Sequence, residues 1–296
     1  MTMARLLKVA VVQHACSDDR LQNLETSIRG IREAATQGAQ LVLLQEMHTA
    51  LYFCQTEDPG QFDLAEPVPG PTTEALAELA RELQIVVVSS VFEQRTAGIY
   101  HNTAVVLDRD GDVAGCYHKM HIPDDPGYHE KYYFTPGDQG FEPIVTSVAK
   151  LGVLVCWDQW YPEAARLMAM RGAEILLYPT AIGWDPDDSD NEKRRQLDSW
   201  VTIQRAHAIA NGLPAMICNR VGFEPHPEGS GGIQFWGSSF VAGPQGEILS
   251  QAPYDAPKVL LAELDQGRIE AVRRVWPFFR DRRIDAYADL TRRYSQ

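Results

Sequence analysis

Residues 151–180 read LGVLVCWDQWYPEAARLMAMRGAEILLYPT and predict a strand, a sharp turn, a helix and a second strand. The first apolar run ends on Cys156, Pro162 stands where a first helical residue belongs, and Gly172 follows the last helical turn. A cysteine that only fills space would be expected inside the apolar run. Cys156 instead lies at the corner between strand and helix, where a side chain stands clear of the sheet and backbone N–H groups can face a substrate. We therefore interpret Cys156 as a nucleophile.

The N-terminal third of the chain alternates between two periodicities. Short branched apolar runs predict buried strands at residues 6–13, 41–46 and 85–93. Helical spacing of apolar residues predicts helices between these strands, at about 19–38 and 72–83, with Asp18 or Asp19 as the cap of the first. This order predicts an α/β domain with largely parallel strands.

The rest of the chain contains echoes of this pattern. Residues 102–119 predict a hairpin around Asp110 and Gly111, and residues 237–252 predict a second one around Gly246. We further expect a helix at about 197–210 and one strand at 214–223. The echoes suggest two α-β halves that face each other. Since no Pro- or Ser-rich linker divides the chain, we expect a single domain over residues 1–296.

Composition excludes several classes of function. The 27 basic and 40 acidic side chains give a net charge of −13, which repels phosphate backbones, so we expect no nucleic-acid partner. The five cysteines form no CxxC pair, which argues against a disulfide framework or a structural zinc site and indicates a reducing compartment. No apolar run approaches the ~18 residues of a membrane helix. We expect a cytoplasmic protein without membrane contact.

A thiol with a pKa of about 8.5 needs a base or a cation nearby to react at neutral pH. Glu46 closes the apolar run LVLLQE, where a carboxylate is costly unless it is paired or used. Lys119 follows the first hairpin, in GCYHKMHIPDD. Taken alone, each of these two residues would be interpreted as a surface residue at the end of a strand.

Taken together, the segments around Glu46, Lys119 and Cys156 resemble the nitrilase (carbon–nitrogen hydrolase) superfamily, and the resemblance covers essentially the whole chain. It implies a four-layer αββα sandwich. It also implies a homo-oligomer, with a C-terminal segment of about 266–296 at a subunit interface. The segments HKMHIPDDPGYHEKYYFTPGD (118–138) and CWDQWYPEAARLMAMRGAEILLYPTAIG (156–183) resemble most the branch that hydrolyses N-carbamoylputrescine.

The resemblance implies a role for each matching residue. Glu46 would be the general base that takes the thiol proton and later activates water. Lys119 and the Trp157 N–H would hold the oxyanion, and Glu130 would be the second glutamate, which holds Lys119 and the substrate nitrogen. The thiol mechanism requires no cofactor and no metal.

The substrate is expected to be a small cation. Relatives that act on N-carbamoyl amino acids carry arginines soon after the nucleophile, whereas this chain has Asp158 and Gln159 there and no arginine before Arg166. By the resemblance, Asp185 would bind an ammonium group between walls formed by Tyr52 and Tyr128. The expected reaction converts N-carbamoylputrescine to putrescine, carbon dioxide and ammonia.

Three alternatives remain open at this stage. A carbamoylase or ω-amidase of the same superfamily would use the same chemistry on another linear substrate. A metal-dependent hydrolase could use His118, His121 and His129, although His-x-x-His outside a helix is a weak zinc signal. A homologue without catalytic activity could retain the fold as a ligand-binding protein.

Overall fold

Two six-stranded sheets form the centre of the molecule in a computed structural model that describes residues 6–295. The first sheet contains, in spatial order, β15 (Lys258–Asp265), β1 (Leu6–Gln13), β2 (Leu41–Leu44), β3 (Val86–Thr96), β4 (Ile99–Leu107) and β5 (Val113–His118). The second contains β14 (Ile248–Gln251), β13 (Phe240–Ala242), β10 (Ala215–Asn219), β8 (Ile175–Thr180), β7 (Lys150–Val153) and β6 (Ile144–Val145).

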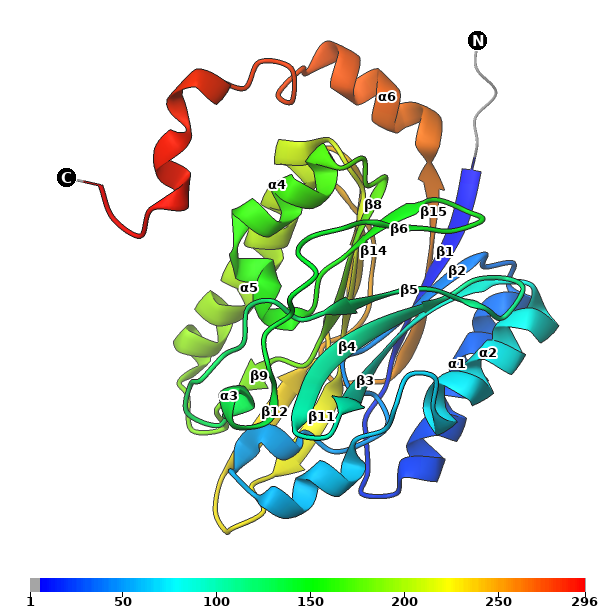
Figure 1. The fold of residues 1–296 in the computed structure, drawn as a ribbon, viewed down its shortest axis with the longest axis vertical. Helices are drawn as coiled ribbons and strands as arrows, with labels where there is room; N and C mark the ends of the chain where they lie inside the picture. Colours follow the sequence, from blue (N-terminus) through cyan, green and yellow to red (C-terminus); the bar gives the residue numbers. More distant parts are fainter. Residues whose placement is uncertain (1–5, 296) are drawn as a thin grey trace.

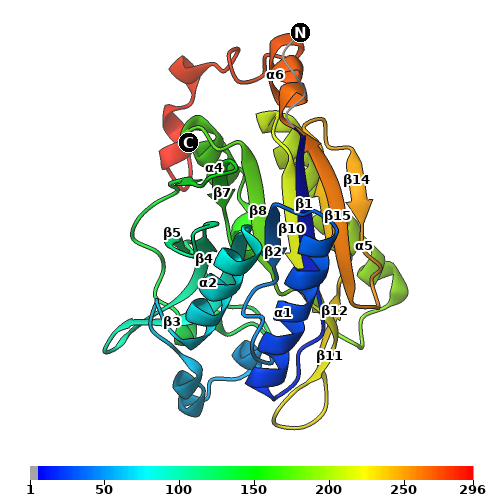
Figure 2. The ribbon, with the colours of Figure 1, turned by 90° about the vertical axis from the view of Figure 1, so that its right-hand side faces the viewer.

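Helices cover the outer face of each sheet, which confirms the predicted αββα sandwich (Figure 1). The first sheet is covered by α1 (Arg20–Thr36) and α2 (Pro71–Leu83), which lie in front of it in Figure 2. The second is covered by α4 (Pro162–Met170) and α5 (Asp190–Asn211). The two-residue period of a strand explains the layers. In β1, Val9 and Val11 join the core between the sheets, whereas Ala10 and Val12 face α1 and α2.

Strand direction differs from the expectation of largely parallel sheets. Only β1, β2 and β3 in the first sheet and β10, β8 and β7 in the second are parallel, and the remaining pairs in both sheets are antiparallel. The two predicted hairpins, β4–β5 and β13–β14, form and account for two of the antiparallel pairs, whereas the β3–β4 hairpin and the pairing of β15 with β1 were not predicted. Both halves therefore have the same plan, in agreement with the echoes in the sequence.

Local signals in the sequence set some boundaries and missed others. Asp19 is the N-cap of α1 and accepts a hydrogen bond from the Gln22 N–H, as expected. Helix α5 begins at Asp190 rather than near residue 197, because the Ser189 hydroxyl caps it. The single strand predicted at 214–223 is wrong: it is broken at Arg220 into β10 and β11 (Val221–Pro225). With β12 (Gly232–Trp236) and β9 (Gly183–Trp184), β11 forms a small third sheet that was not predicted.

Helix α6 (Gln266–Val275) ends just before Pro277, as the proline predicts, and the C-terminal segment then passes over α4, where Arg166 lies 5.2 Å from the centre of the Phe279 ring (Figure 1). This segment exposes large apolar side chains at Trp276, Phe278, Ile284, Tyr287, Leu290 and Tyr294. Its place at a subunit interface stays a prediction. Within residues 6–295, no helix has the length and apolar character needed to cross a membrane.

Helix α1 approaches β1 closely because Gly30 has no side chain. A Cβ atom at Gly30 would lie 2.4 Å from Cγ1 of Val12. Gly30→Ala improves helix propensity by about 1 kcal/mol, but forcing an atom into a filled core costs about 1–3 kcal/mol. We expect Gly30→Ala to lower the melting temperature. In a Val12→Ala background the clash is gone, and the same substitution should raise it. Stabilisation by Gly30→Ala in the wild-type background would contradict this account of the packing.

Candidate active site

Cys156 occupies a sharp corner at the start of the short helix η3 (Cys156–Trp160). Its φ of +42° is in the left-handed region, which is uncommon for a residue with a Cβ and persists only where the surroundings hold it. Asp158 provides that support, because its Oδ2 accepts hydrogen bonds from the Val155 N–H (2.9 Å) and the Tyr117 hydroxyl (2.8 Å). The strand–turn–helix read from the sequence therefore forms, with Pro162 at the start of α4.

Glu46 follows β2, and its carboxylate is buried among donors from the first sheet. Its Oε1 accepts hydrogen bonds from Lys119 Nζ (2.9 Å) and from Asn102 Nδ2 (2.7 Å). Asn102 lies on β4 and also accepts the backbone N–H of Lys119 through its own carbonyl (2.9 Å). Asn102 thus contacts both members of the pair, Glu46 through its side-chain amide and Lys119 through its backbone carbonyl. The other carboxylate oxygen, Oε2 of Glu46, is buried and has no hydrogen-bond partner among residues 6–295.

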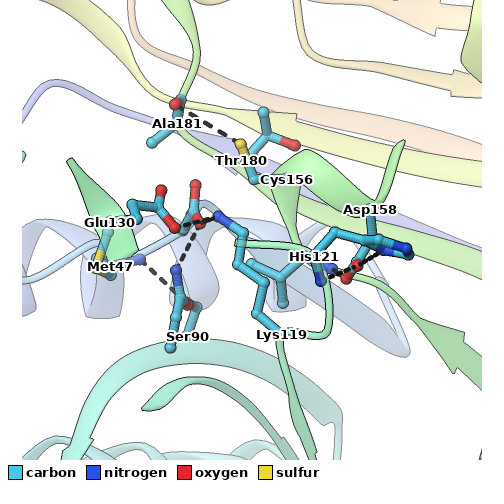
Figure 3. A network of polar contacts seen from close by, with 12 residues as sticks. Met47, Ser90, Lys119, His121, Glu130, Cys156, Asp158, Thr180 and Ala181 are labelled. Carbon is cyan, nitrogen blue, oxygen red and sulfur yellow. Dashed lines mark hydrogen bonds and ion pairs between the residues drawn. The ribbon is translucent and has the colours of Figure 1, made fainter. Parts of the chain in front are cut away.

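Lys119 lies between two carboxylates in the interior (Figure 3). Its Nζ is 2.6 Å from Oε2 of Glu130 in addition to its bond with Glu46, and the side chains of all three are fully buried. Glu130 begins the short helix α3 (Glu130–Tyr133), and its Oε1 accepts the Tyr52 hydroxyl (2.7 Å). Two carboxylates and one ammonium group thus meet in the interior of the protein.

The cluster sets the protonation states of its members. Burial opposes the charge of Lys119, but Glu130 and Glu46 outweigh burial and hold its pKa well above the ordinary value. Burial raises the pKa of Glu130 to about 7, against the lowering effect of Lys119. Burial, followed by the charge of Glu46, raises the pKa of the Cys156 thiol well above its usual range, although Lys119 opposes this. We therefore expect the resting sulfur to be a neutral thiol. Its Sγ lies 3.8 Å from the Ala181 carbonyl oxygen (Figure 3).

A cavity of about 660 Å³ opens onto Cys156 and Glu130. Trp157 and Tyr128 also line it, and the Tyr128 hydroxyl is fixed by the Gly183 N–H (3.0 Å). Its remaining charged lining residues are four acids and one arginine, so the cavity is acidic. These residues are Asp125, Asp185, Asp188, Glu192 and Arg195.

The structure brings Glu46, Lys119, Glu130 and Cys156 together and places Trp157, Tyr128 and Asp185 at the cavity. Tyr52 needs a correction: it does not line the cavity but lies buried behind Glu130, to which its hydroxyl donates. Asp158, which stands where some relatives carry an arginine, does not line the cavity, because its carboxylate is buried within the Cys156 corner.

The three histidines considered as metal ligands bind separate partners. His118 Nε2 contacts Glu93 (2.9 Å), His121 Nδ1 contacts Asp158 (2.7 Å), and His129 lies 3.9 Å from Asp124. In the part of the chain that the structure describes, no three His, Cys, Asp or Glu side chains converge as a metal site would require.

Two residues at the site were missed in the sequence. Asn102 could have been suspected, since an amide inside the strand IYHNTAVVL is costly to bury without partners. Arg195 left no comparable signal, because its run NEKRR is typical of an exposed helix face. The absence of an arginine close to Cys156 in the sequence therefore did not mean an absence of arginine from the cavity.

The neutral thiol is open to a direct test. Thiolate absorbs in the ultraviolet, and the difference between wild type and Cys156→Ser isolates the Cys156 contribution. Because burial and Glu46 raise the Cys156 pKa, we expect no thiolate step below about pH 8.5, where a free cysteine is half ionised. Cys116, on β5, offers a control through Cys116→Ser, which should leave the difference signal unchanged. A Cys156-dependent step near neutral pH would contradict the assignment.

Comparison with known proteins identifies the family. The model of the family described as carbon-nitrogen hydrolase matches residues 8–274. N-carbamoylputrescine amidase from Solanum lycopersicum is 45% identical over 289 residues, which are 97% of this chain and 95% of that protein. Citrullinase from Francisella tularensis is 40% identical over 289 residues, 97% of this chain and 99% of that protein.

A crystal structure of a carbon-nitrogen hydrolase from Helicobacter pylori G27 superposes with a TM-score of 0.95 and 53% sequence identity. The match covers 98% of this chain and 100% of that one. The family match spans most of the chain, and these relatives are similar over nearly their full length. The chain belongs to the carbon–nitrogen hydrolase family, within the nitrilase superfamily that its sequence resembles, and is a hydrolase of carbon–nitrogen bonds other than peptide bonds.

Proposed function

We propose that the protein hydrolyses N-carbamoylputrescine to putrescine, carbon dioxide and ammonia. The observation that carries the proposal is a single acidic cavity, lined at one place by Cys156 and Glu130 and elsewhere by four further carboxylates. The reactive end suits a planar carbamoyl group, and the acidic lining suits a tail that ends in an ammonium group. The similarity to N-carbamoylputrescine amidases over 97% of the chain supports the same substrate.

The first half-reaction is assigned to Cys156 and Glu46. Oε1 of Glu46 is occupied by Lys119 and Asn102, so its unpartnered Oε2 is the oxygen available to take the thiol proton. Since the resting thiol is neutral, proton transfer accompanies the attack of sulfur on the carbamoyl carbon. General base catalysis of this kind contributes about 10²–10⁴-fold.

The tetrahedral intermediate carries its negative charge on the former carbonyl oxygen. Lys119, held protonated by its two carboxylates, and the Trp157 N–H are the proposed donors to that oxygen; one such donor is worth about 3–4 kcal/mol of the barrier. Collapse breaks the bond to the amine nitrogen, which receives the proton from Glu46 and leaves as putrescine. Cys156 is left as a carbamoyl thioester.

Water completes the cycle. Glu46 removes a proton from a water molecule that attacks the thioester carbon, the carbon–sulfur bond breaks, and the thiol regains its proton. The released carbamic acid decomposes to carbon dioxide and ammonia. Glu130 is proposed to hold Lys119 and, from its place on the cavity wall, the substrate nitrogen.

Arg195 supports a second candidate substrate, citrulline. This arginine lines the cavity beside Asp188 and Glu192 and could pair with an α-carboxylate, while the acids bind an α-ammonium group. A relative of this chain is named citrullinase, which supports citrulline as a candidate substrate. Arg195 is already paired with Glu192 at 3.1 Å and its side chain is 74% exposed, so it contributes little attraction. N-carbamoylputrescine is therefore preferred.

Ammonia release from a panel of ureas tests the substrate. We expect the highest kcat/KM for N-carbamoylputrescine, at least about tenfold above citrulline and above uncharged N-butylurea, because each 1.4 kcal/mol of ammonium binding is a factor of ten. Asp185→Asn should reduce the advantage over N-butylurea, and Cys156→Ser should abolish turnover of all three. Faster hydrolysis of citrulline would instead favour the second candidate.

The pH dependence follows from Glu130. Its pKa is raised to about 7, so its negative charge, which holds Lys119, is lost as pH falls through about 7. We expect kcat/KM to fall on the acid side with a midpoint near 7. Because the pKa of Lys119 is raised, we expect no fall in kcat/KM on the basic side of neutral pH. Glu130→Gln should have a lower plateau without this acid limb. A wild-type profile that stays flat well below pH 7 would contradict the assignment.

A further inference from the structure

Arg220 lies at the break between β10 and β11 and is completely buried. Its guanidinium group donates to four oxygen atoms and lies 5.2 Å from the centre of the Phe235 ring. A buried charge is costly unless its hydrogen bonds are satisfied, and here three of the four acceptors belong to the segment that follows β2. The acceptors are the carbonyl oxygens of Glu46 (3.1 Å), Met47 (2.9 Å) and Ala50 (3.0 Å), and Oε1 of Glu224 (2.6 Å).

Glu224, on β11, holds the far end of the same segment. One of its oxygens pairs with Arg220, and the other, Oε2, accepts the backbone N–H of Tyr52 at 2.5 Å. Residues 46–52 are therefore held at their start by Arg220 and at their end by Glu224. Met47, within this segment, has a φ of +46°, a conformation that a residue with a side chain keeps only under such restraint.

The two ends of the segment meet the catalytic cluster from opposite sides. At its start, Glu46 accepts from Lys119; at its end, the Tyr52 hydroxyl donates to Glu130, which also binds Lys119. The interactions close into a ring that runs through Arg220, Glu224, Tyr52, Glu130, Lys119 and Glu46. A shift of the segment would move both glutamates relative to the ammonium group.

We propose that Arg220 and Glu224 are positioning residues for the hydrolysis: they form a clamp on residues 46–52 that places Glu46 and Tyr52 around Lys119 and Glu130. This proposal rests on the proposed role of Glu46 as the base for Cys156. Neither clamp residue lines the cavity, so neither touches the substrate. Misplacing a catalytic group by about 1 Å can cost about 10²-fold in rate.

Conservative variants separate position from charge. Arg220→Lys keeps the positive charge but cannot reach four acceptors with the fork of a guanidinium group. We expect kcat to fall about 100-fold while KM changes by less than about threefold, as for loss of an interaction that matters in the transition state. Glu224→Gln keeps the shape but removes the ion pair, with an expected loss of about tenfold. Arg205→Lys is the matched control, because Arg205 donates to the Gly246 carbonyl away from the cavity.

Alkylation of Cys156 by iodoacetamide provides a readout that does not depend on the substrate. If Glu46 is misplaced as the base for the Cys156 thiol, the alkylation rate of each folded variant should fall along with kcat. Should N-carbamoylputrescine prove to be the wrong substrate, the alkylation rates still decide the role of the clamp.

Circular dichroism and thermal melts establish which variants are folded. If Arg220→Lys does not fold, the same measurements on Glu224→Gln decide. Folded clamp variants that keep both kcat and the alkylation rate within about threefold of wild type would overturn the proposal, because loss of a positioning contact lowers the chemical step. Equal losses in Arg205→Lys would also overturn it, since they would indicate a general effect of arginine replacement.

Discussion

The ammonium group of Lys119, shared by two buried carboxylates, is the interaction on which the rest of the site depends. Glu46 and Glu130 lie 2.9 and 2.6 Å from it, and the side chains of all three are inaccessible to solvent. One cation cannot neutralise two anions, so the cluster keeps an excess of negative charge in a dry environment. Burial raises the pKa of Glu130 despite Lys119, and burial together with that excess raises the pKa of the Cys156 thiol. Both effects favour a neutral sulfur at rest, and the proposed mechanism therefore assigns its proton to the free oxygen of Glu46.

The sandwich explains how residues so far apart in the chain reach one place. Glu46 follows β2 and Lys119 follows β5 in one sheet, while Cys156 follows β7 in the other, and the two sheets face each other across a shared core. The Glu46 N–H donates to the Thr180 carbonyl at the end of β8, which links the sheets at this edge. The apolar strands thus have a second role besides stabilising the fold, because Glu46, Lys119 and Cys156 all follow strand ends that lie close together.

Much of this architecture could be read from local patterns. Period-two and helical spacing located most strands and helices. Cys156 and Glu46 each attracted attention because a reactive or charged group ended an apolar run, and Lys119 joined them through the family resemblance. The pattern failed where a tertiary contact overrode it. The expected strand at 214–223 breaks at Arg220, because that side chain turns inward to bind three carbonyls after β2. The family resemblance predicted Tyr52 as a wall of the substrate pocket, yet Tyr52 lies outside the cavity lining and its hydroxyl donates to Glu130.

The sequence by itself determined the order of elements, the corner that carries Cys156 and the acidic character of the chain, since these depend on neighbours within a few residues. Only the tertiary structure decided which oxygen of Glu46 is free, that Asn102 and the Arg220–Glu224 pair support the cluster, and that Arg195 enters the cavity. The physical reason is distance along the chain. Contacts between residues that are tens to hundreds of positions apart leave no periodic pattern in the sequence, because they form only when the two halves of the chain pack against each other.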